Sequence, residues 1–396
     1  MSPVPAPKPP AIDLRGEPFR LFFPMAFLLG AAGVFHWMLY GTGLSSAYLA
    51  SFHAVTQMQS FLLAFAAGFL LTAVPKRTGT APATPLELGA LAVLIPAVSV
   101  AELAASPVLA QLLYATAIVL LVQFAARRFL GRAAGRRPPA SFVLVPIGLA
   151  AGVAGAVLRV ASARDLLPAW AGSLGRALAL EGVFTCLVLG IGGFFFGLAL
   201  YGDPPPDLGK NRAESRRAAA LAVAGVLVIA GLAAQELGHV REGLALRAIV
   251  AAAVLAAARG LSRPARPGVN RRIVWLSAWA VPLGLALAAL FPDDRVAWMH
   301  VAFIGGFGLL AFSVAAHVTL GHAGHEAARD GRPWQVIALA ALFLAAMLLR
   351  ATLGRVPDLY FGWLAAAAVL WLAGAVVWAV FLVPRMWRPP AGTASA

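Results

Sequence analysis

Imidazole side chains are the clearest candidates for chemistry in this chain of 396 residues. Seven histidines are present, and five of them (His36, His53, His300, His317 and His322) lie within or just beyond long apolar runs. His36, His53 and His300 fall near one end of their runs, at the same expected membrane surface. Because neutral imidazole is a ligand for haem iron and copper, these three indicate a cofactor site. The alternative for each histidine is a hydrogen bond to a neighbouring helix or to water.

His300 and His322 occupy one apolar run, 22 residues apart. At 100° and 1.5 Å per residue, a regular α-helix places them within about 40° of one face and about 33 Å apart. One helix would then present an imidazole at each membrane surface. We therefore predict His300, His322, His53 and His36 as cofactor-binding residues.

Softer and acidic groups accompany these histidines. Met58 follows His53 in the same run and adds a thioether, so His300, His322, His317 and Met58 are the predicted metal ligands. Simple packing is the alternative for the methionine. Glu181 lies inside an apolar run and is the better of two acidic candidates for moving protons.

Motifs for common catalysis are absent from the sequence. It contains no Walker-type phosphate loop, no His-Glu-x-x-His and no Cys-x-x-Cys-His, so no catalytic motif is assigned and any haem would be held non-covalently. A single cysteine, Cys186, excludes a disulfide framework and a thiolate-rich metal site.

The elements that must position these residues are membrane helices. The chain is 61% hydrophobic and only 12% charged, with a mean hydropathy of +0.84, whereas soluble proteins carry about 25% charged residues. This composition excludes a water-soluble fold and predicts an all-α polytopic membrane protein. The net charge of +15 is divided among loops, so no nucleic-acid partner is expected.

Twelve apolar runs predict about 12 transmembrane helices, at about 19–41, 49–74, 86–105, 107–127, 142–161, 174–200, 217–236, 244–260, 272–291, 296–320, 333–353 and 360–384. The run at 244–260 is the weakest, because Arg247 interrupts it. If the connections between the runs alternate between the two sides of the membrane, 23 of the 31 basic residues lie on one side and 8 on the other. Because cytoplasmic loops collect Lys and Arg, this distribution predicts cytoplasmic N- and C-termini. Arg350, near the end of a run, is expected to extend to the membrane interface.

The runs divide the chain into two six-helix halves. We predict a disordered cytoplasmic tail at 1–17, helices one to six within 18–202 and a cytoplasmic loop at 203–216. Helices seven to twelve follow within 217–385, and a second cytoplasmic tail covers 386–396.

Several segments together resemble the NnrS family. They are Pro18-Phe-Arg-Leu-Phe-Phe23 before the first helix, Gly68-Phe-Leu-Leu-Thr-Ala-Val-Pro-Lys-Arg-Thr-Gly79 at the end of the second, and His300 with Leu320-Gly-His-Ala-Gly324. The resemblance spans both halves of the chain in the same order. It implies a multi-pass protein of bacterial inner membranes that binds haem and copper and is associated with the nitric oxide response and denitrification.

This chain departs from the family pattern at several points. The early His-Glu-Met stretch of the second helix reads His53-Ala-Val-Thr-Gln-Met58, so the His-Glu pair is missing. His317 stands where the family has an arginine, and Gly192-Gly193-Phe194 lacks the arginine of a Gly-Gly-Arg pattern. The resemblance therefore implies a divergent member, in which His300, His322 and His53 carry over.

The histidines and the family resemblance together favour a haem- and copper-binding membrane protein whose ligand is nitric oxide or another small gas. The redox partner is unknown, and the lipid bilayer is the expected environment. A secondary transporter of a small solute is the alternative, because twelve helices in two sixes also suit that architecture. A third hypothesis is a helical scaffold that has lost its cofactors.

Overall fold

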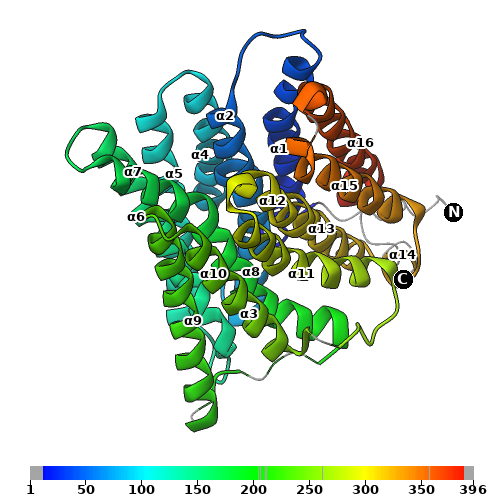
Figure 1. Cartoon of the computed structure of the whole chain (residues 1–396). Coiled ribbons are helices and arrows are strands. Elements are labelled where there is room, and N and C mark those ends of the chain that lie inside the picture. The colour runs from blue at the N-terminus through cyan, green and yellow to red at the C-terminus, as the bar shows by residue number, and fades with distance from the viewer. Residues whose placement is uncertain are drawn as a thin grey trace, which may run out of the picture.

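Helices account for nearly all regular structure in the computed structural model of the chain. It describes residues 12–203, 205, 207–209, 212–260, 262–355 and 357–387. Figure 1 shows α6 and α9 along one flank, α1, α15 and α16 along the other, and α3, α8 and α13 between them. Within the described residues the only extended pairing is an isolated bridge between Pro139 and Asp207.

The helices follow one another with short connections. In chain order they are α1 Phe19–Gly41, α2 Ala50–Val55, η1 Thr56–Phe61, α3 Leu62–Thr78, α4 Pro85–Leu103, α5 Pro107–Leu130, η2 Ala140–Val143, α6 Leu144–Ala163, α7 Ala169–Ala177, η3 Leu178–Gly182, α8 Val183–Phe196, η4 Gly197–Tyr201, α9 Arg212–Glu236, α10 Val240–Leu255, η5 Ala256–Gly260, α11 Val269–Leu290, η6 Pro292–Asp294, α12 Arg295–His300, η7 Val301–Gly308, α13 Leu309–His322, α14 Glu326–Asp330, α15 Trp334–Ala351, η8 Leu353–Arg355, η9 Pro357–Leu359 and α16 Tyr360–Met386.

Where consecutive elements are joined into continuous helices, eleven helices among the described residues are long and apolar enough to cross a membrane. They confirm an all-α polytopic membrane protein. The predicted run at 244–260 is also helical, as α10 continued by η5, and it packs between α9 and α11. It is not among the eleven candidate spans, and it carries three charged residues, Arg241, Glu242 and Arg247.

Three spans form the interior of the bundle. Residues 50–78, 169–201 and 292–322 are the longest candidate spans and have the largest buried share of their apolar windows, at 83%, 72% and 67%. Each contains a π-helical segment (η1, η3 and η7, respectively) in which the turn widens. Because π segments in α-helices frequently occur at functional sites, their presence in all three interior spans indicates where to look for one.

The first and last long helices define the two ends of the bundle. At one end, called proximal here, the Arg20 guanidinium donates to the backbone oxygen of Met386, so α1 begins beside the point where α16 ends. At the opposite, distal end, a side chain at Gly41 would clash with the Phe361 carbonyl, so α1 ends against the start of α16. His53 and His300 lie toward the distal end, and His317 and His322 toward the proximal end.

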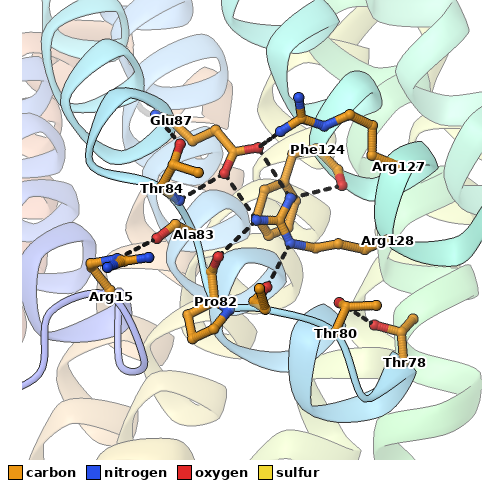
Figure 2. Close-up of polar contacts among 11 residues, drawn as sticks. Arg15, Thr78, Thr80, Pro82, Ala83, Thr84, Glu87, Phe124, Arg127 and Arg128 are labelled. Atoms are coloured by element: carbon orange, nitrogen blue, oxygen red, sulfur yellow. Dashed lines mark hydrogen bonds and ion pairs between the residues drawn. The ribbon is translucent and has the colours of Figure 1, made fainter. Parts of the chain in front are cut away.

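A buried arginine fastens the proximal loop between α3 and α4 (Figure 2). Arg128 on α5 is only 6% exposed and donates to the carbonyls of Ala81 and Pro82 at 3.2 and 2.9 Å. It also binds both carboxylate oxygens of Glu87, at 3.0 and 2.9 Å. The same carboxylate accepts from the backbone of Thr84, which completes a capping box at the start of α4. One side chain therefore fixes a helix start, a loop and a neighbouring helix.

The predicted tails and central loop lie partly outside the described residues, which begin at 12, end at 387 and omit 204, 206, 210 and 211. Of the segment assigned to the first tail, Arg15 donates from Nε to the Ala83 carbonyl at 3.0 Å, and Glu17 pairs with Arg20 at 2.6 Å. These contacts join residues 15–17 to the proximal end of the bundle.

Replacing Arg128 is expected to destabilise the protein. Arg128→Ala removes the buried charge that binds both oxygens of the Glu87 carboxylate and leaves the Ala81 and Pro82 carbonyls without this donor, which costs about 3 kcal/mol of unfolding free energy. Arg132→Ala is the matched control, because Arg132 is exposed and donates one hydrogen bond, to Phe129. Thermal unfolding in detergent, followed by tryptophan fluorescence, measures the difference. Equal melting temperatures for the two variants would contradict this role.

Candidate functional site

A cavity of about 520 Å³ lies in the distal half of the bundle, between the three interior spans and helices α1, α15 and α16. Its size falls within the usual range for small-molecule and cofactor sites. The wall includes Phe61, Leu62, Leu180 and Trp371, so much of the interior is apolar. His53 and His300, both predicted cofactor ligands, line the same cavity from separate spans.

His53 is held by helix α1. Its Nδ1 lies 2.8 Å from the Gly33 carbonyl oxygen, so Nδ1 carries the proton and Nε2 keeps its lone pair. Gln57, one turn later, donates to the Gly30 carbonyl at 2.8 Å. This close approach requires glycine on α1, because a Cβ at Gly33 would lie 2.5 Å from the Gln57 amide nitrogen. The α1 backbone thus sets both the position and the tautomer of His53.

His300 is held by its own helix. Its Nδ1 lies 2.6 Å from the Val296 carbonyl oxygen, one turn earlier in α12, which again leaves the Nε2 lone pair free. The π segment η7 begins at the next residue. A Cβ at Gly284 of α11 would meet the Ala302 backbone nitrogen at 2.4 Å, so α11 packs directly against this segment. Both cavity histidines therefore have the orientation that metal-bound imidazoles show, with the second ring nitrogen bonded to a carbonyl.

Two methionines add thioethers to the same wall. Met58 lies in η1, close after His53, and Met299 immediately precedes His300. Both are buried, at 6% exposure each. The cavity therefore combines neutral imidazole and thioether groups, the donor types that suit haem iron and copper.

A charged pair lies beside the cavity. Glu181 in η3 lines the wall and accepts from Arg247 of α10, which is 1% exposed and also donates to Gln235 Oε1 at 2.9 Å. Glu236 lines the cavity as well and accepts from Gln235 Nε2 at 2.9 Å. The Glu181 carboxylate explains why Arg247 interrupts the apolar run at 244–260, since the two side chains neutralise each other inside the bundle.

Three arginines lie around the distal side of the cavity: Arg176 of α7, Arg295 of α12 and Arg350 of α15. Arg176 and Arg295 are exposed, and Arg350 is half-buried. Arg350, which was expected to extend to the membrane interface, lines this cavity at its distal side. Among the described residues none of the three forms an ion pair.

The other predicted ligands lie apart from the cavity wall. His36 is buried beside His53, with 5.9 Å between ring centroids, and neither of its nitrogens has a hydrogen-bond partner. His322 accepts at Nε2 from the Lys76 ammonium at 2.7 Å, while its Nδ1 bonds to the Val318 carbonyl. His317 packs against Phe195. The structure thus brings together His53, His300 and Met58 from the predicted set, and places His317 and His322 toward the other end.

Over the described part of the chain, no group of three or more His, Cys, Asp or Glu residues is arranged to hold a metal ion. The donors at the cavity are accordingly two imidazoles and two thioethers, which is a smaller set than the sequence suggested.

The prediction that His300 and His322 share one helix face assumed an unbroken α-helix. Instead, η7 spans eight residues between them. A π turn holds more residues than an α turn, so the faces that follow it are rotated relative to those that precede it. This widened turn separates the environments of the two imidazoles.

Aromatic rings lie below the cavity, toward the proximal end. Phe61 and Trp371 of the wall contact Phe312, at centroid distances of 5.6 and 5.8 Å, and Phe312 contacts Trp378 at 5.0 Å. Trp378 Nε1 donates to the Phe312 carbonyl at 3.0 Å, which fixes the cluster. In the described residues the cavity lining ends at these rings, an arrangement that favours a binding site over a continuous solute path.

A smaller cavity of about 110 Å³ lies beside the same spans. Its wall contains only apolar residues and glycine, including Phe65, Phe195, Phe307 and Leu310. Without polar groups it offers water no hydrogen bonds. The polar chemistry of the interior is therefore concentrated at the larger cavity.

Comparison with protein families decides the relationship. The model of the family described as NnrS protein matches residues 13–389, nearly the whole chain. The chain belongs to the NnrS family. It is therefore a multi-pass membrane protein of the NnrS type, a family linked to the nitric oxide response. The comparison with curated proteins finds no match.

Sequence reasoning missed several residues that line the cavity of this NnrS-family protein. The three arginines and the Gln235–Glu236 pair come from helices far apart in the sequence, so no local motif links them. The distribution of basic residues in the sequence nonetheless indicated these three arginines. Arg176, Arg295 and Arg350 belong to the eight basic residues on the side predicted to be poor in positive charge, where each needs a particular reason.

The Glu181–Arg247 pair gives a test of the interior electrostatics. Glu181→Ala leaves Arg247 buried without its partner and is expected to cost about 3 kcal/mol of unfolding free energy. Arg247→Met should cost less, because Glu181 is partly exposed to the cavity and can be hydrated there. The double variant should recover part of the loss. Thermal unfolding of the three variants in detergent measures these differences, and additive losses would show that the pair is not coupled.

Proposed function

We propose that this NnrS-family protein binds haem non-covalently in the distal cavity, with His53 and His300 as the principal ligands. The proposal rests on one property that the two imidazoles share, a free Nε2 lone pair. Each bonds through Nδ1 to a backbone carbonyl, so each keeps an Nε2 lone pair beside a cavity of about 520 Å³. A ring nitrogen that faces a cavity without a protein hydrogen-bond partner suits metal binding.

The residues present fit such a group in three respects. The apolar wall suits a flat hydrophobic ring, and the charged residues lie on the distal side. The aromatic cluster around Phe312 excludes water from below. Gly33 and Val296 hold the imidazoles in one tautomer through their carbonyls, whether or not a ligand is present. Haem would supply an iron centre, and nitric oxide or another small gas would bind it in place of one of the two imidazoles.

His36, His317 and His322 are weaker candidates for this role. The Nε2 lone pair of His322 is already engaged by Lys76, so a metal there would have to displace that ammonium group. His36 lies beside His53 and could ligate only after a rearrangement that brings its ring to the cavity wall.

Copper is the second cofactor of the proposal. Met58 and Met299 contribute thioethers to the cavity wall, and thioether sulfur is a ligand that suits Cu(I).

The biological setting follows from the family. We infer a role in the response to nitric oxide or nitrogen-oxide stress, in a bacterial inner membrane, with the distal end facing away from the cytoplasm. The distribution of 23 and 8 basic residues supports this orientation. No catalytic motif is assigned, so binding of the gas is the proposed activity.

An optical spectrum tests the haem proposal. Full-length protein in detergent should show a Soret band that shifts when dithionite is added. His53→Ala and His300→Ala should each lower haem content at least tenfold, because each removes one of two ligands. His239→Ala is the matched control, since His239 is exposed at the start of α10 and does not line the cavity. An unchanged spectrum in both cavity variants would refute the assignment.

Elemental analysis tests the copper proposal separately. The double variant Met58→Leu/Met299→Leu keeps the apolar volume but removes both sulfur atoms, so copper per protein should fall while haem content stays. Met38→Leu serves as the control, because Met38 does not line the cavity. Equal copper content in all three proteins would exclude thioether ligation.

A further inference from the structure

Three arginines line the cavity without an ion-pair partner among the described residues. Arg176, Arg295 and Arg350 reach it from three different helices. Two acidic residues line the cavity, Glu181 and Glu236. Glu181 is neutralised by Arg247, so the three arginines outnumber the remaining carboxylate.

The position of these arginines makes the imbalance informative. They lie at the distal end, where the sequence keeps only 8 of its 31 basic residues. Three cations around one cavity repel one another, and the repulsion is stronger next to an apolar wall than in water. An anionic ligand held between the arginines would reduce this repulsion.

The geometry of guanidinium indicates which anion. Its planar fork of N–H donors matches the two oxygens of a carboxylate or of another planar oxyanion. Below the arginines the wall becomes apolar, with Phe61, Leu180 and Trp371. A volume of about 520 Å³ far exceeds a small oxyanion, so the site suits a larger molecule that is charged at one end and apolar at the other.

We propose that Arg176, Arg295 and Arg350 form a carboxylate-binding mouth, which holds the acid groups of an amphipathic ligand whose apolar body fills the cavity. The proposal rests on the proposed function in one respect: it takes a tetrapyrrole, with two carboxylates on one edge of an apolar ring, as that ligand. The arginines bind the carboxylates and the histidines bind the metal. The two contributions are therefore separable.

Metal-free protoporphyrin IX and its dimethyl ester provide the test, because neither depends on ligation by histidine. Each is titrated into the full-length protein in detergent, free of bound tetrapyrrole, and binding is followed by quenching of tryptophan emission. Trp37 and Trp371 line the cavity and report on its occupancy. The diacid should bind at least tenfold more tightly than the diester, a difference of about 1.4 kcal/mol.

Substitutions in the carboxylate-binding mouth should weaken binding of the diacid and leave binding of the diester unchanged. Arg350→Gln and Arg295→Gln should each weaken diacid binding about three- to tenfold and leave diester binding unchanged. Unchanged diester binding also shows that a variant is folded. Arg164→Gln is the matched control, since Arg164 is an exposed arginine on the same predicted side that does not line the cavity.

Four further results would be decisive. Equal affinity of the unaltered protein for diacid and diester, or equal weakening of both by Arg350→Gln, would overturn the proposal. Arg350-dependent binding of free nitrite, without discrimination between diacid and diester, would assign the mouth to small oxyanions and also overturn it. If the diacid is preferred but ferric haem gains no affinity from His53 and His300, the mouth is supported and the proposed ligation fails.

Discussion

Polar groups inside a membrane protein must find partners within the protein, because the hydrocarbon region offers them no water. Several buried polar pairs of the interior satisfy this constraint. Gln59 and Gln111, both buried, exchange two amide hydrogen bonds of 3.1 and 2.9 Å. Ser99 donates to Ser60, which in turn donates to the Ile95 carbonyl. The Nε2 atoms of His53 and His300 differ from these pairs, because they line the cavity while only Nδ1 of each ring bonds to the protein.

The widened turns of the interior spans connect this chemistry to the fold. In η1, η3 and η7 the backbone departs from the α-helical repeat next to His53, at Glu181 and next to His300, respectively. Such a departure changes which side chains face the neighbouring helices and weakens the regular hydrogen-bond pattern. Tight packing compensates for that loss, as the contact of Gly284 with Ala302 shows. The three interior spans therefore combine local irregularity with the greatest burial.

The sequence predicted those features that depend on composition and local periodicity. The interior spans appeared as apolar runs at 49–74, 174–200 and 296–320, within a few residues of their bounds in the structure. It also placed His53 and His300 at the same end of the bundle. It did not predict the partner of Arg247 or the direction of Arg350, because these depend on contacts between helices that are distant in the sequence. The π segments were missed because an inserted residue leaves hydropathy unchanged while it shifts every later face.

His300 and His322 show why residue type alone is insufficient to assign a ligand. Both sit on the same interior span and both bond through Nδ1 to a carbonyl one turn earlier. Their Nε2 atoms differ, since that of His322 accepts from Lys76 and that of His300 does not have such a donor. An ammonium group competes directly with a metal for the lone pair, and it also repels a cation. The availability of Nε2, which only the folded arrangement reveals, separates a candidate ligand from a histidine already used in packing the bundle.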